Sequence, residues 1–395
     1  MSQRAISEEY RLLAGLFVSR APYYALIPYL PLLLARLDFD AGSVGGLLSA
    51  AAFFAAVVSV LIGPLADIYP IPMVLRSLAL TSAALSLTMA ISIGRFSVFF
   101  ASAGLIILRS AIDTLVKTQI AKNLSGSTAY ESMMKSRYFL ANLAALIGPA
   151  IYSVLDGSRE LICGLLAFGC VVLAFCLTTK RNDTLEAIPL SRSRALDLAG
   201  AGLDKGLLVC VAHGAFLFYV LSQITIVLPQ YFVSLSEKSA GTYISIVVSW
   251  SAVLIVVLHP VYQKFSSRMS RRNQMIAGSM LVVLSQIVLC GLGRFTSDVH
   301  LVIAAATAFT AGELFLFPLY SVVLSRLASQ TTQGTYAGLG SLYLLGSAVG
   351  PFVGIQIMQH LGIFYVFFSS ALIALAAMLA GLAANLEAER RSSTA

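Results

Sequence analysis

Residues 43–66 read SVGGLLSAAAFFAAVVSVLIGPLA and contain no charged side chain. A helix rises about 1.5 Å per residue, so roughly 20 apolar residues cross the hydrocarbon core of a bilayer. This stretch is 24 residues long by its own numbering, which is enough to cross. It therefore predicts a transmembrane helix.

Apolar runs of the same kind occur along the whole chain. They predict further spans near residues 11–35, 73–94, 97–120, 137–156 and 160–179, and then near 205–233, 240–262, 274–293, 299–325, 335–359 and 363–385. A polar stretch separates the two sets. We expect an all-α membrane protein of about twelve transmembrane helices, with one six-helix bundle in residues 1–179, a cytoplasmic linker at 180–203 and a second bundle in 204–395.

The composition supports a lipid environment. The chain is 58% hydrophobic and 11% charged, whereas soluble domains carry roughly 25% charged residues. The net charge of +8 does not indicate a nucleic-acid binder, because the basic residues lie between apolar runs and form no cluster interleaved with aromatics. They concentrate on one side of the predicted membrane, which follows the positive-inside rule. We expect a multi-pass protein of the cell membrane, in particular a bacterial inner membrane, with both termini cytoplasmic.

Motifs for cofactors, metals and catalysis are missing from the sequence. The five cysteines fall inside apolar runs without a Cys-x-x-Cys pair, and no His, Cys and Asp residues are spaced as metal ligands. A phosphate-binding loop with its lysine is also missing, which argues against direct driving by ATP. We therefore expect no enzyme activity, no cofactor and no metal.

The two halves of the chain carry similar landmarks about two hundred residues apart. Pro28 corresponds to Pro229, and Gly148-Pro149 corresponds to Gly350-Pro351. The segment from Gly63 to Asp67 corresponds to the one from His259 to Gln263. Three matches in the same order predict two pseudo-symmetric halves.

With these landmarks the chain resembles the major facilitator superfamily over nearly its whole length. In that family the loop after the second helix has a Gly-x-x-x-Asp-Arg-x-Gly-Arg-Arg pattern. Gly63 and Asp67 match its first half, whereas Ile68 and the segment Pro70–Pro72 replace its glycine and cationic positions. The family's salt-bridge latch therefore lacks its usual cations here.

Two Gly-Pro segments resemble a motif of the family's antiporters. The fifth span keeps its centre as Gly148-Pro149, and the eleventh repeats it as Gly346, Gly350, Pro351 and Gly354. Small residues let helices approach closely, and proline permits bending. The resemblance implies a conformational role for these residues together with Gly63 and Asp67; the alternative is tight packing alone.

Four charged side chains stand clearly within the interior of predicted spans, away from their ends: Arg20, Arg109, Asp113 and Glu313. Each costs roughly 2.5–3.5 kcal/mol at the centre of a bilayer on insertion scales, so such residues usually serve a function. Arg109 and Asp113 are one helical turn apart and can pair, either as a structural ion pair or as a pair that opens during transport. Glu313 stands in a Gly-Glu-x-x-x-x-Pro segment similar to that of proton-driven exporters. We expect Glu313, Asp113 and Arg109 to couple transport to protons; the alternative for Glu313 is a permanently protonated, hydrogen-bonded carboxyl.

Polar and aromatic side chains in the spans are candidates for binding a substrate, because rings give broad contact and polar groups orient a ligand. They are Arg20, Tyr23, Tyr24, Asn142, His213, Tyr219, Gln223 and Trp250. Tyrosine and tryptophan also anchor helices at the bilayer surface. A lone histidine such as His213 is often a packing residue.

The resemblance implies a secondary active transporter that works by alternating access, closest in pattern to proton-coupled exporters of drugs or metabolites. We expect efflux of a small molecule in exchange for protons, by a single chain in the lipid bilayer. The alternatives are export of an anionic metabolite such as a carboxylate siderophore, proton-coupled import, and a membrane receptor that binds without transporting.

Overall fold

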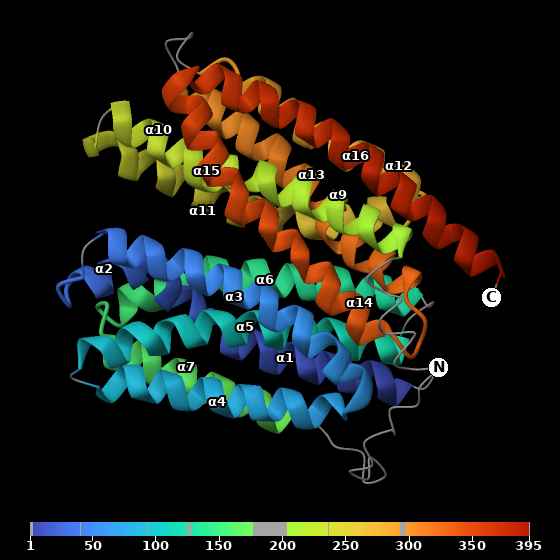
Figure 1. The fold of residues 1–395 in the computed structure, drawn as a ribbon, viewed down its shortest axis with the longest axis horizontal. Helices are drawn as coiled ribbons and strands as arrows, with labels where there is room; N and C mark the ends of the chain where they lie inside the picture. The colour runs from blue at the N-terminus through green and yellow to red at the C-terminus, as the bar shows by residue number, and fades with distance from the viewer. Residues whose placement is uncertain are drawn as a thin grey trace. The chain divides into compact units, whose positions relative to one another are not determined.

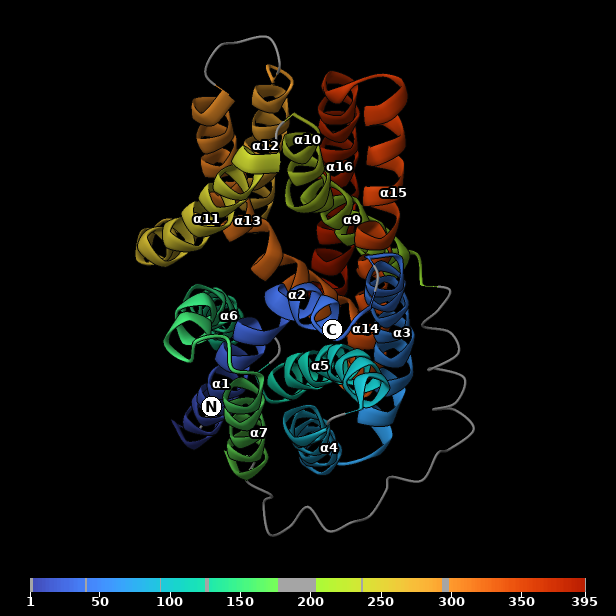
Figure 2. The same ribbon diagram turned by 90° about the vertical axis from the view of Figure 1, so that its left-hand side faces the viewer.

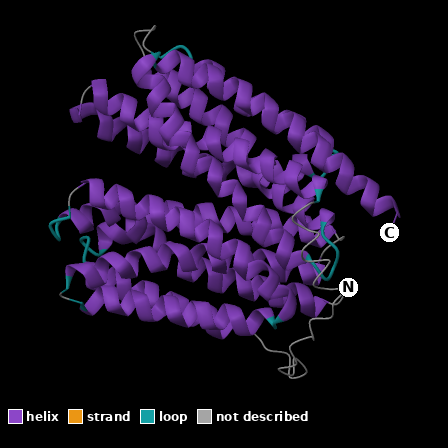
Figure 3. Ribbon diagram, viewed as in Figure 1, coloured by secondary structure: helices purple, strands orange, loops and turns teal. Residues whose placement is uncertain are grey.

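The computed structural model describes residues 3–39, 41–92, 94–124, 128–176, 204–235, 237–292 and 298–394. Within these ranges every regular element is helical (Figure 3). This agrees with the predicted all-α fold. The predicted linker, 180–203, lies outside the described residues.

The chain separates into two compact units that do not follow its order strictly. The first consists of Met1–Gly202 and Ala328–Ser341, and the second of Leu203–Leu327 and Leu342–Ala395. The sequence analysis assigned residues 328–341 to the second bundle. In the structure these residues pack with the first.

The first unit contains α1 (Gln3–Leu26), η1 (Ile27–Tyr29), α2 (Leu30–Ala35), α3 (Ala41–Ile68), α4 (Ile71–Ile91), α5 (Arg95–Leu124), α6 (Thr128–Val154), α7 (Arg159–Cys176) and α14 (Gln333–Gly340). In this unit α1 packs against α6 and α7, and α4 packs against α5 and α7. Helix α14 packs against both α3 and α5, so a late segment of the chain lies beside two early ones (Figures 1 and 2).

The second unit contains α9 (Lys205–Ser222), the π-helix η2 (Gln223–Val227), α10 (Leu228–Leu235), α11 (Glu237–Ser266), α12 (Arg271–Leu289), α13 (Asp298–Leu327), α15 (Leu344–His360) and α16 (Ile363–Thr394). Here α12 packs against α13 and α16, and α9 packs against α15 and α16. The short η3 (Ser341–Tyr343) joins α14 to α15, and the division between the two units falls within it.

Helix length and composition agree with a multi-pass membrane protein. Among the described residues, nine helical segments are long and apolar enough to cross a bilayer. Three more described helices, α1, α6 and α11, have 24, 27 and 30 residues, which is also long enough to cross. The nine segments and these three helices together equal the twelve spans predicted from the sequence. Large apolar side chains such as Phe100, Phe168 and Phe352 are exposed, as expected where lipid replaces water as the solvent.

Several helices contain a proline within their length. Pro64, Pro149, Pro260, Pro318 and Pro351 lie inside helices, where each removes one backbone hydrogen bond. In the second unit a π-helix precedes Pro229, from Gln223 to Val227. Such π segments are rare and frequently occur at functional sites.

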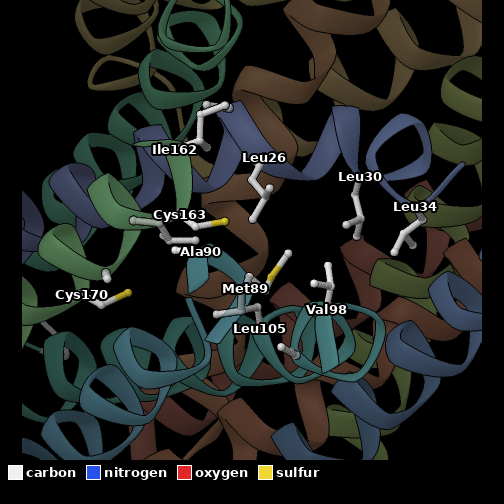
Figure 4. Close-up of a cluster of buried hydrophobic side chains, with 14 of the residues drawn as sticks. Leu26, Leu30, Leu34, Met89, Ala90, Val98, Leu105, Ile162, Cys163 and Cys170 are labelled. Carbon is white, nitrogen blue, oxygen red and sulfur yellow. The ribbon is translucent and has the colours of Figure 1, made fainter. Parts of the chain in front are cut away.

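A cluster of apolar side chains forms part of the core of the first unit (Figure 4). Leu26 and Leu30 of the first span meet Met89 and Leu105 there, together with Cys163 of α7. All five cysteines are free thiols. Cys163 and Cys170 are buried in this cluster, as small apolar residues rather than as ligands.

Candidate functional site

Three of the ionisable side chains predicted within spans meet in the first unit. Arg20 of α1 donates from Nη2 to Asp113 Oδ2 of α5. Arg109 Nη2, one turn before Asp113 on the same helix, lies 3.6 Å from Asp113 Oδ1. The side chains of Arg20 and Arg109 are 6% and 10% exposed, whereas that of Asp113 is 25% exposed. The carboxylate is therefore more accessible than the two guanidinium groups that hold it.

Further contacts fix the orientation of Arg109. Its Nη1 donates to Ser19 Oγ at 3.2 Å, and Ser19 in turn donates to the carbonyl oxygen of Leu16 at 2.9 Å. The Cζ atom of Arg109 lies 5.5 Å from the ring centroid of Tyr23, within the range of a cation–π interaction. Tyr23, a predicted substrate-binding residue, thus belongs to the same cluster.

Two more cations lie close enough to act electrostatically on Asp113. They are Lys117, one turn further along α5, and Arg137 of α6. We call Arg20, Arg109, Lys117, Arg137 and Asp113 the cationic cluster. It brings four basic side chains together with one acidic one. A partly desolvated site of this kind attracts anions and repels cations.

The motif residue Asp67 is held at the start of α14. Its carboxylate, 0% exposed, accepts from the backbone N–H of Gly334 at 2.8 Å and of Thr335 at 2.7 Å. The Thr335 hydroxyl donates to it at 2.9 Å, and Lys122 Nζ of α5 lies 3.1 Å away. A helix N-terminus favours a carboxylate through its unpaired N–H groups and its dipole. Asp67 therefore has a cationic partner, a lysine on another helix in place of the missing cations of the loop.

Gly63 makes this arrangement possible. A Cβ atom at Gly63 would overlap the carbonyl oxygen of Gly334 and lie 2.9 Å from Cα of Gly338. Helices α3 and α14 therefore touch backbone to backbone, and only glycine fits at the crossing.

The two Gly-Pro motifs are also helix-packing surfaces, each within one unit. A Cβ at Gly148 of α6 would lie 2.6 Å from the carbonyl carbon of Tyr24 in α1. On α15, Gly346, Gly350 and Gly354 press against Ala215, Ser222 and Gln223 so closely that a Cβ at any of them would overlap an atom of these residues. Pro149 and Pro351 follow the central glycine of each surface.

The other candidate binding residues fall into two groups. Asn142 and Trp250 retain exposure: Asn142 donates to the carbonyl of Tyr138 on its own helix at 3.0 Å, and Trp250 donates to Thr307 Oγ1 at 2.8 Å. His213, Tyr219 and Gln223 are buried among the helices of the second unit. Gln223 donates to the carbonyl of Gly350 at 2.9 Å, and His213 contacts the carbonyl of Ala377 at 2.7 Å. Their roles in binding remain predictions.

Glu313 lies on α13 in the second unit and is partly exposed. The preceding Gly312 packs against Gly278 of α12, where a Cβ at Gly312 would lie 2.6 Å from the Gly278 carbonyl oxygen. Within the described ranges, no group of three or more His, Cys, Asp or Glu side chains could hold a metal ion.

Comparison with known proteins identifies the family. The sequence model of the Major Facilitator Superfamily matches residues 12–344 and 214–394. The chain belongs to this superfamily. Its members are membrane transporters rather than enzymes, so the resemblance and fold class predicted from the sequence are confirmed, and membership agrees with the prediction that the chain is not an enzyme.

Three members or solved structures similar to this chain share 16–23% of its sequence in the matched regions. The uncharacterized MFS-type transporter YqjV of Bacillus subtilis (strain 168) is 23% identical over 224 residues, which are 55% of this chain and 54% of that protein, so the match spans about half of the relative's length. The human organic anion transporter MFSD10 (TETRAN) superposes with a TM-score of 0.71 at 18% identity, over 96% of this chain and 100% of that one. A bacterial homologue of the iron transporter ferroportin, in an outward-facing state, gives a TM-score of 0.67 at 16% identity, over 98% and 99%. These likenesses show the shared fold.

Sequence reasoning missed four residues of these sites. Lys122 and Thr335 complete the environment of Asp67, and Ser19 and Arg137 surround Arg109 and Asp113. Lys122 and Arg137 were visible only as part of the inner positive charge. The contact with Thr335 joins residues 268 positions apart, and no local pattern marks it.

Proposed function

We propose that this chain is a secondary active transporter that exports a small organic anion in exchange for protons. The observation that supports an anionic substrate is that the cationic cluster gathers four basic side chains around one acidic one. A hydrophobic cation, the typical cargo of a drug exporter, would be repelled there. An anion with an apolar body would find both arginines and the ring of Tyr23.

Asp113 gives the cluster a means of exchange. When the substrate is absent, the carboxylate of Asp113 binds the two arginines. A carboxylate substrate would bind them in the same way. An arriving carboxylate competes for one guanidinium, and protonation of Asp113 would weaken its hold on both. Release of substrate lets Asp113 return to the arginines. Glu313 carries the transported proton in this proposal, as its segment's likeness to proton-driven exporters suggests.

The driving force for such an exchange is ample. The proton gradient supplies about 1.4 kcal/mol per pH unit, and the membrane potential about 2.3 kcal/mol per charge per 100 mV. Moving one proton inward and one monoanion outward transfers two charges, so roughly 4.6 kcal/mol is available per 100 mV. That sustains an outward concentration gradient of about a thousandfold. The exchange should therefore be strongly electrogenic.

The proposal is tested in proteoliposomes containing a pH-sensitive dye. One panel of mono-, di- and tricarboxylates and one panel of hydrophobic cations are added, and proton movement is recorded with and without an imposed potential. We expect carboxylates to move protons and hydrophobic cations to have no effect. Proton movement driven by the cations alone would overturn the anionic substrate class.

One variant and a matched control test the role of Glu313. Glu313→Gln should abolish proton-driven efflux and leave substrate counterflow intact, because counterflow needs no net proton transfer. The matched control is Glu160→Gln, an exposed acid at the start of α7, which should behave as wild type. Unchanged active efflux in Glu313→Gln would rule out the proton role of Glu313.

A further inference from the structure

The first unit has a pocket where its first span ends. Its volume is about 290 Å³, and its lining residues come from α1, η1 and the region of α2, and from α6, α7 and the turn between them. Leu26 and Ile162 line it and also belong to the apolar cluster in Figure 4, so part of its wall is apolar. The cationic cluster contributes none of the described lining. The pocket is therefore a separate site, formed within the first unit.

Two stacked tyrosines form another part of the lining. The rings of Tyr29 and Tyr152 lie within 8° of parallel, with their centroids 3.5 Å apart. Gly157 restrains Tyr152, because its N–H donates to the Tyr152 carbonyl oxygen at 2.9 Å and a Cβ at Gly157 would lie 2.8 Å from Tyr152 Oη. The φ of Gly157 is +63°, which glycine adopts without strain. The turn after α6 therefore sets the position of the ring pair.

Two arginines line the pocket, and none of its described lining residues is acidic. Arg36 follows the last residue of α2 and is exposed. Arg159 begins α7 and donates from Nη2 to Glu160 Oε1 at 3.1 Å, but the Glu160 side chain is 61% exposed, so this ion pair is weak. The Nε of Arg159 is buried and has no hydrogen-bond partner among the described residues, although buried donors are usually paired. The pocket therefore attracts an anion, and Arg159 retains an unused donor for it.

The size and the surroundings of the pocket indicate the kind of anion. Its volume of about 290 Å³ lies just below the roughly 300–1,000 Å³ of pockets that enclose a whole drug-sized ligand, so it suits a head group. Val154 and Leu161, on either side of the turn, are 82% and 58% exposed. Apolar side chains exposed on a membrane protein contact acyl chains, and tyrosines near the ends of spans lie at the level of the lipid head groups. The ligand therefore has a small anionic head and an apolar tail.

We propose that this pocket binds the phosphate of an anionic phospholipid. Arg36 and Arg159 bind the phosphate oxygens, the two tyrosine rings pack against the head group, and the acyl chains follow the exposed apolar side chains beside the turn. Guanidinium groups suit phosphate because their N–H donors form a planar fork. With the predicted cytoplasmic termini the lipid belongs to the outer leaflet, since one span separates Arg36 from the N-terminus. The site does not depend on what the chain transports.

The test places a fluorescent reporter beside the pocket in the full chain. Leu161→Trp is made in a Trp250→Phe background, because Trp250 is the one tryptophan of the sequence. The reporter protein is reconstituted in phosphatidylcholine vesicles that contain a minor fraction of brominated phosphatidylglycerol or of brominated phosphatidylethanolamine, whose bromine atoms quench a tryptophan that they contact. We expect the reporter to prefer the anionic lipid over the zwitterionic one about twentyfold, since each basic residue at a membrane surface contributes roughly fivefold.

Arginine variants assign that preference to the pocket. Arg36→Gln/Arg159→Gln should abolish it; should the double variant fail to fold, Arg36→Gln alone, at an exposed side chain, should lower it about fivefold. The matched control is Arg95→Gln, at an exposed arginine that begins α5 and lies outside the pocket lining, and it should keep the preference. Absence of the preference in the reporter protein, its survival in the pocket variants, or an equal loss in Arg95→Gln overturns the site.

Soluble anions are distinguished from lipid in the same vesicles. Inorganic phosphate should weaken the quenching by brominated phosphatidylglycerol no more than potassium chloride of equal ionic strength does. Displacement of the lipid by inorganic phosphate alone would show that the pocket takes a soluble anion, and the lipid assignment would be wrong. The measurement uses no substrate and no proton gradient, so a failure of the proposed function leaves its result unaffected.

Discussion

Lys122 Nζ lies 3.1 Å from Asp67 Oδ1 and donates at 2.6 Å to the carbonyl oxygen of Ala66. The lysine comes from the last turn of α5 and the acid from the end of α3. The carboxylate it faces is fully buried and accepts two backbone N–H groups of α14. Three helices of the first unit are thus joined by one carboxylate, which leads to the first prediction.

Removing the charge of Lys122 leaves a buried carboxylate with backbone donors only. We expect Lys122→Met to lower the free energy of unfolding by about 1–3 kcal/mol, since breaking a buried ion pair leaves an uncompensated charge. Asp67→Asn in that background should recover part of the loss, because the amide needs no cation. Thermal unfolding in detergent measures both. Lys205→Met, at an exposed lysine at the start of α9, should change little. Additive losses in the double variant would contradict direct coupling of the pair.

Two glycines of α3 can be compared: Gly63 lies at the crossing with α14, and Gly46 does not. Gly63→Ala would push a methyl group into the Gly334 carbonyl, whereas Gly46→Ala would meet nothing within 4 Å. We expect Gly63→Ala to destabilise the protein by about 2 kcal/mol or more, as overpacking does. Gly46→Ala should stabilise it by roughly 0.5–1 kcal/mol through helix propensity. The melting temperatures of the two variants should shift in opposite directions; shifts of the same sign would exclude a steric role for Gly63.

Protein stability should depend on the balance of charges in the cationic cluster. Arg20→Gln removes one of the two partners of Asp113, and Asp113→Asn leaves both arginines without their acid. We expect each single variant to lose about 1–3 kcal/mol, and the double variant Arg20→Gln/Asp113→Asn to lose less than the sum. Exchange of carboxylates should nevertheless be lost in the double variant, because it lacks both the Arg20 guanidinium that would bind the substrate and the carboxylate that the substrate displaces. Full transport by the double variant would show that the pair serves folding only.

Arg391 ties together three helix ends of the second unit. It donates to both carboxylate oxygens of Asp204 at 2.7 and 2.8 Å and to the carbonyl of Leu327 at 2.9 Å. Asp204 also caps α9 by accepting from the N–H of Gly206. We expect Arg391→Met to cost about 1.5–3 kcal/mol, the range for hydrogen bonds to charged groups. Arg272→Met, at an exposed arginine in the first turn of α12, should cost under 1 kcal/mol by comparison. Equal unfolding temperatures of these two variants would refute a stabilising role for Arg391.

The parts of this fold that depend on local sequence could be predicted, and those that depend on distant contacts could not. Hydrophobic runs predicted the helices because lipid imposes a minimum apolar length. The pairing of Arg109 with Asp113 was predictable because one turn of helix separates them. The approach of Arg20, 93 residues from Asp113, depends on how α1 packs, which local periodicity does not determine.

The contact between Asp67 and Lys122 also could not be predicted from local sequence. The loop after the second span lacks the family's cations, and the sequence therefore indicated an incomplete motif. Lys122 supplies the charge from another helix, and only the packing of α3 against α5 brings it to Asp67. The π-helix at Gln223–Val227 was not predicted either, because one extra residue in a turn leaves no mark in an apolar run.

The division of the chain into its two units has a consequence for biogenesis. Helix α14 completes the first unit, yet the ribosome makes it only after the whole of α9–α13. Until Gly334 and Thr335 emerge, the carboxylate of Asp67 lacks the two amide donors that satisfy it in the mature protein. A nascent or truncated chain that stops at residue 202 would thus keep Lys122 beside Asp67 but lack its amide donors, and would leave Gly63 of α3 uncovered, a surface suited to retention by a membrane chaperone. Supplying residues 203–395 as a separate polypeptide should relieve that retention.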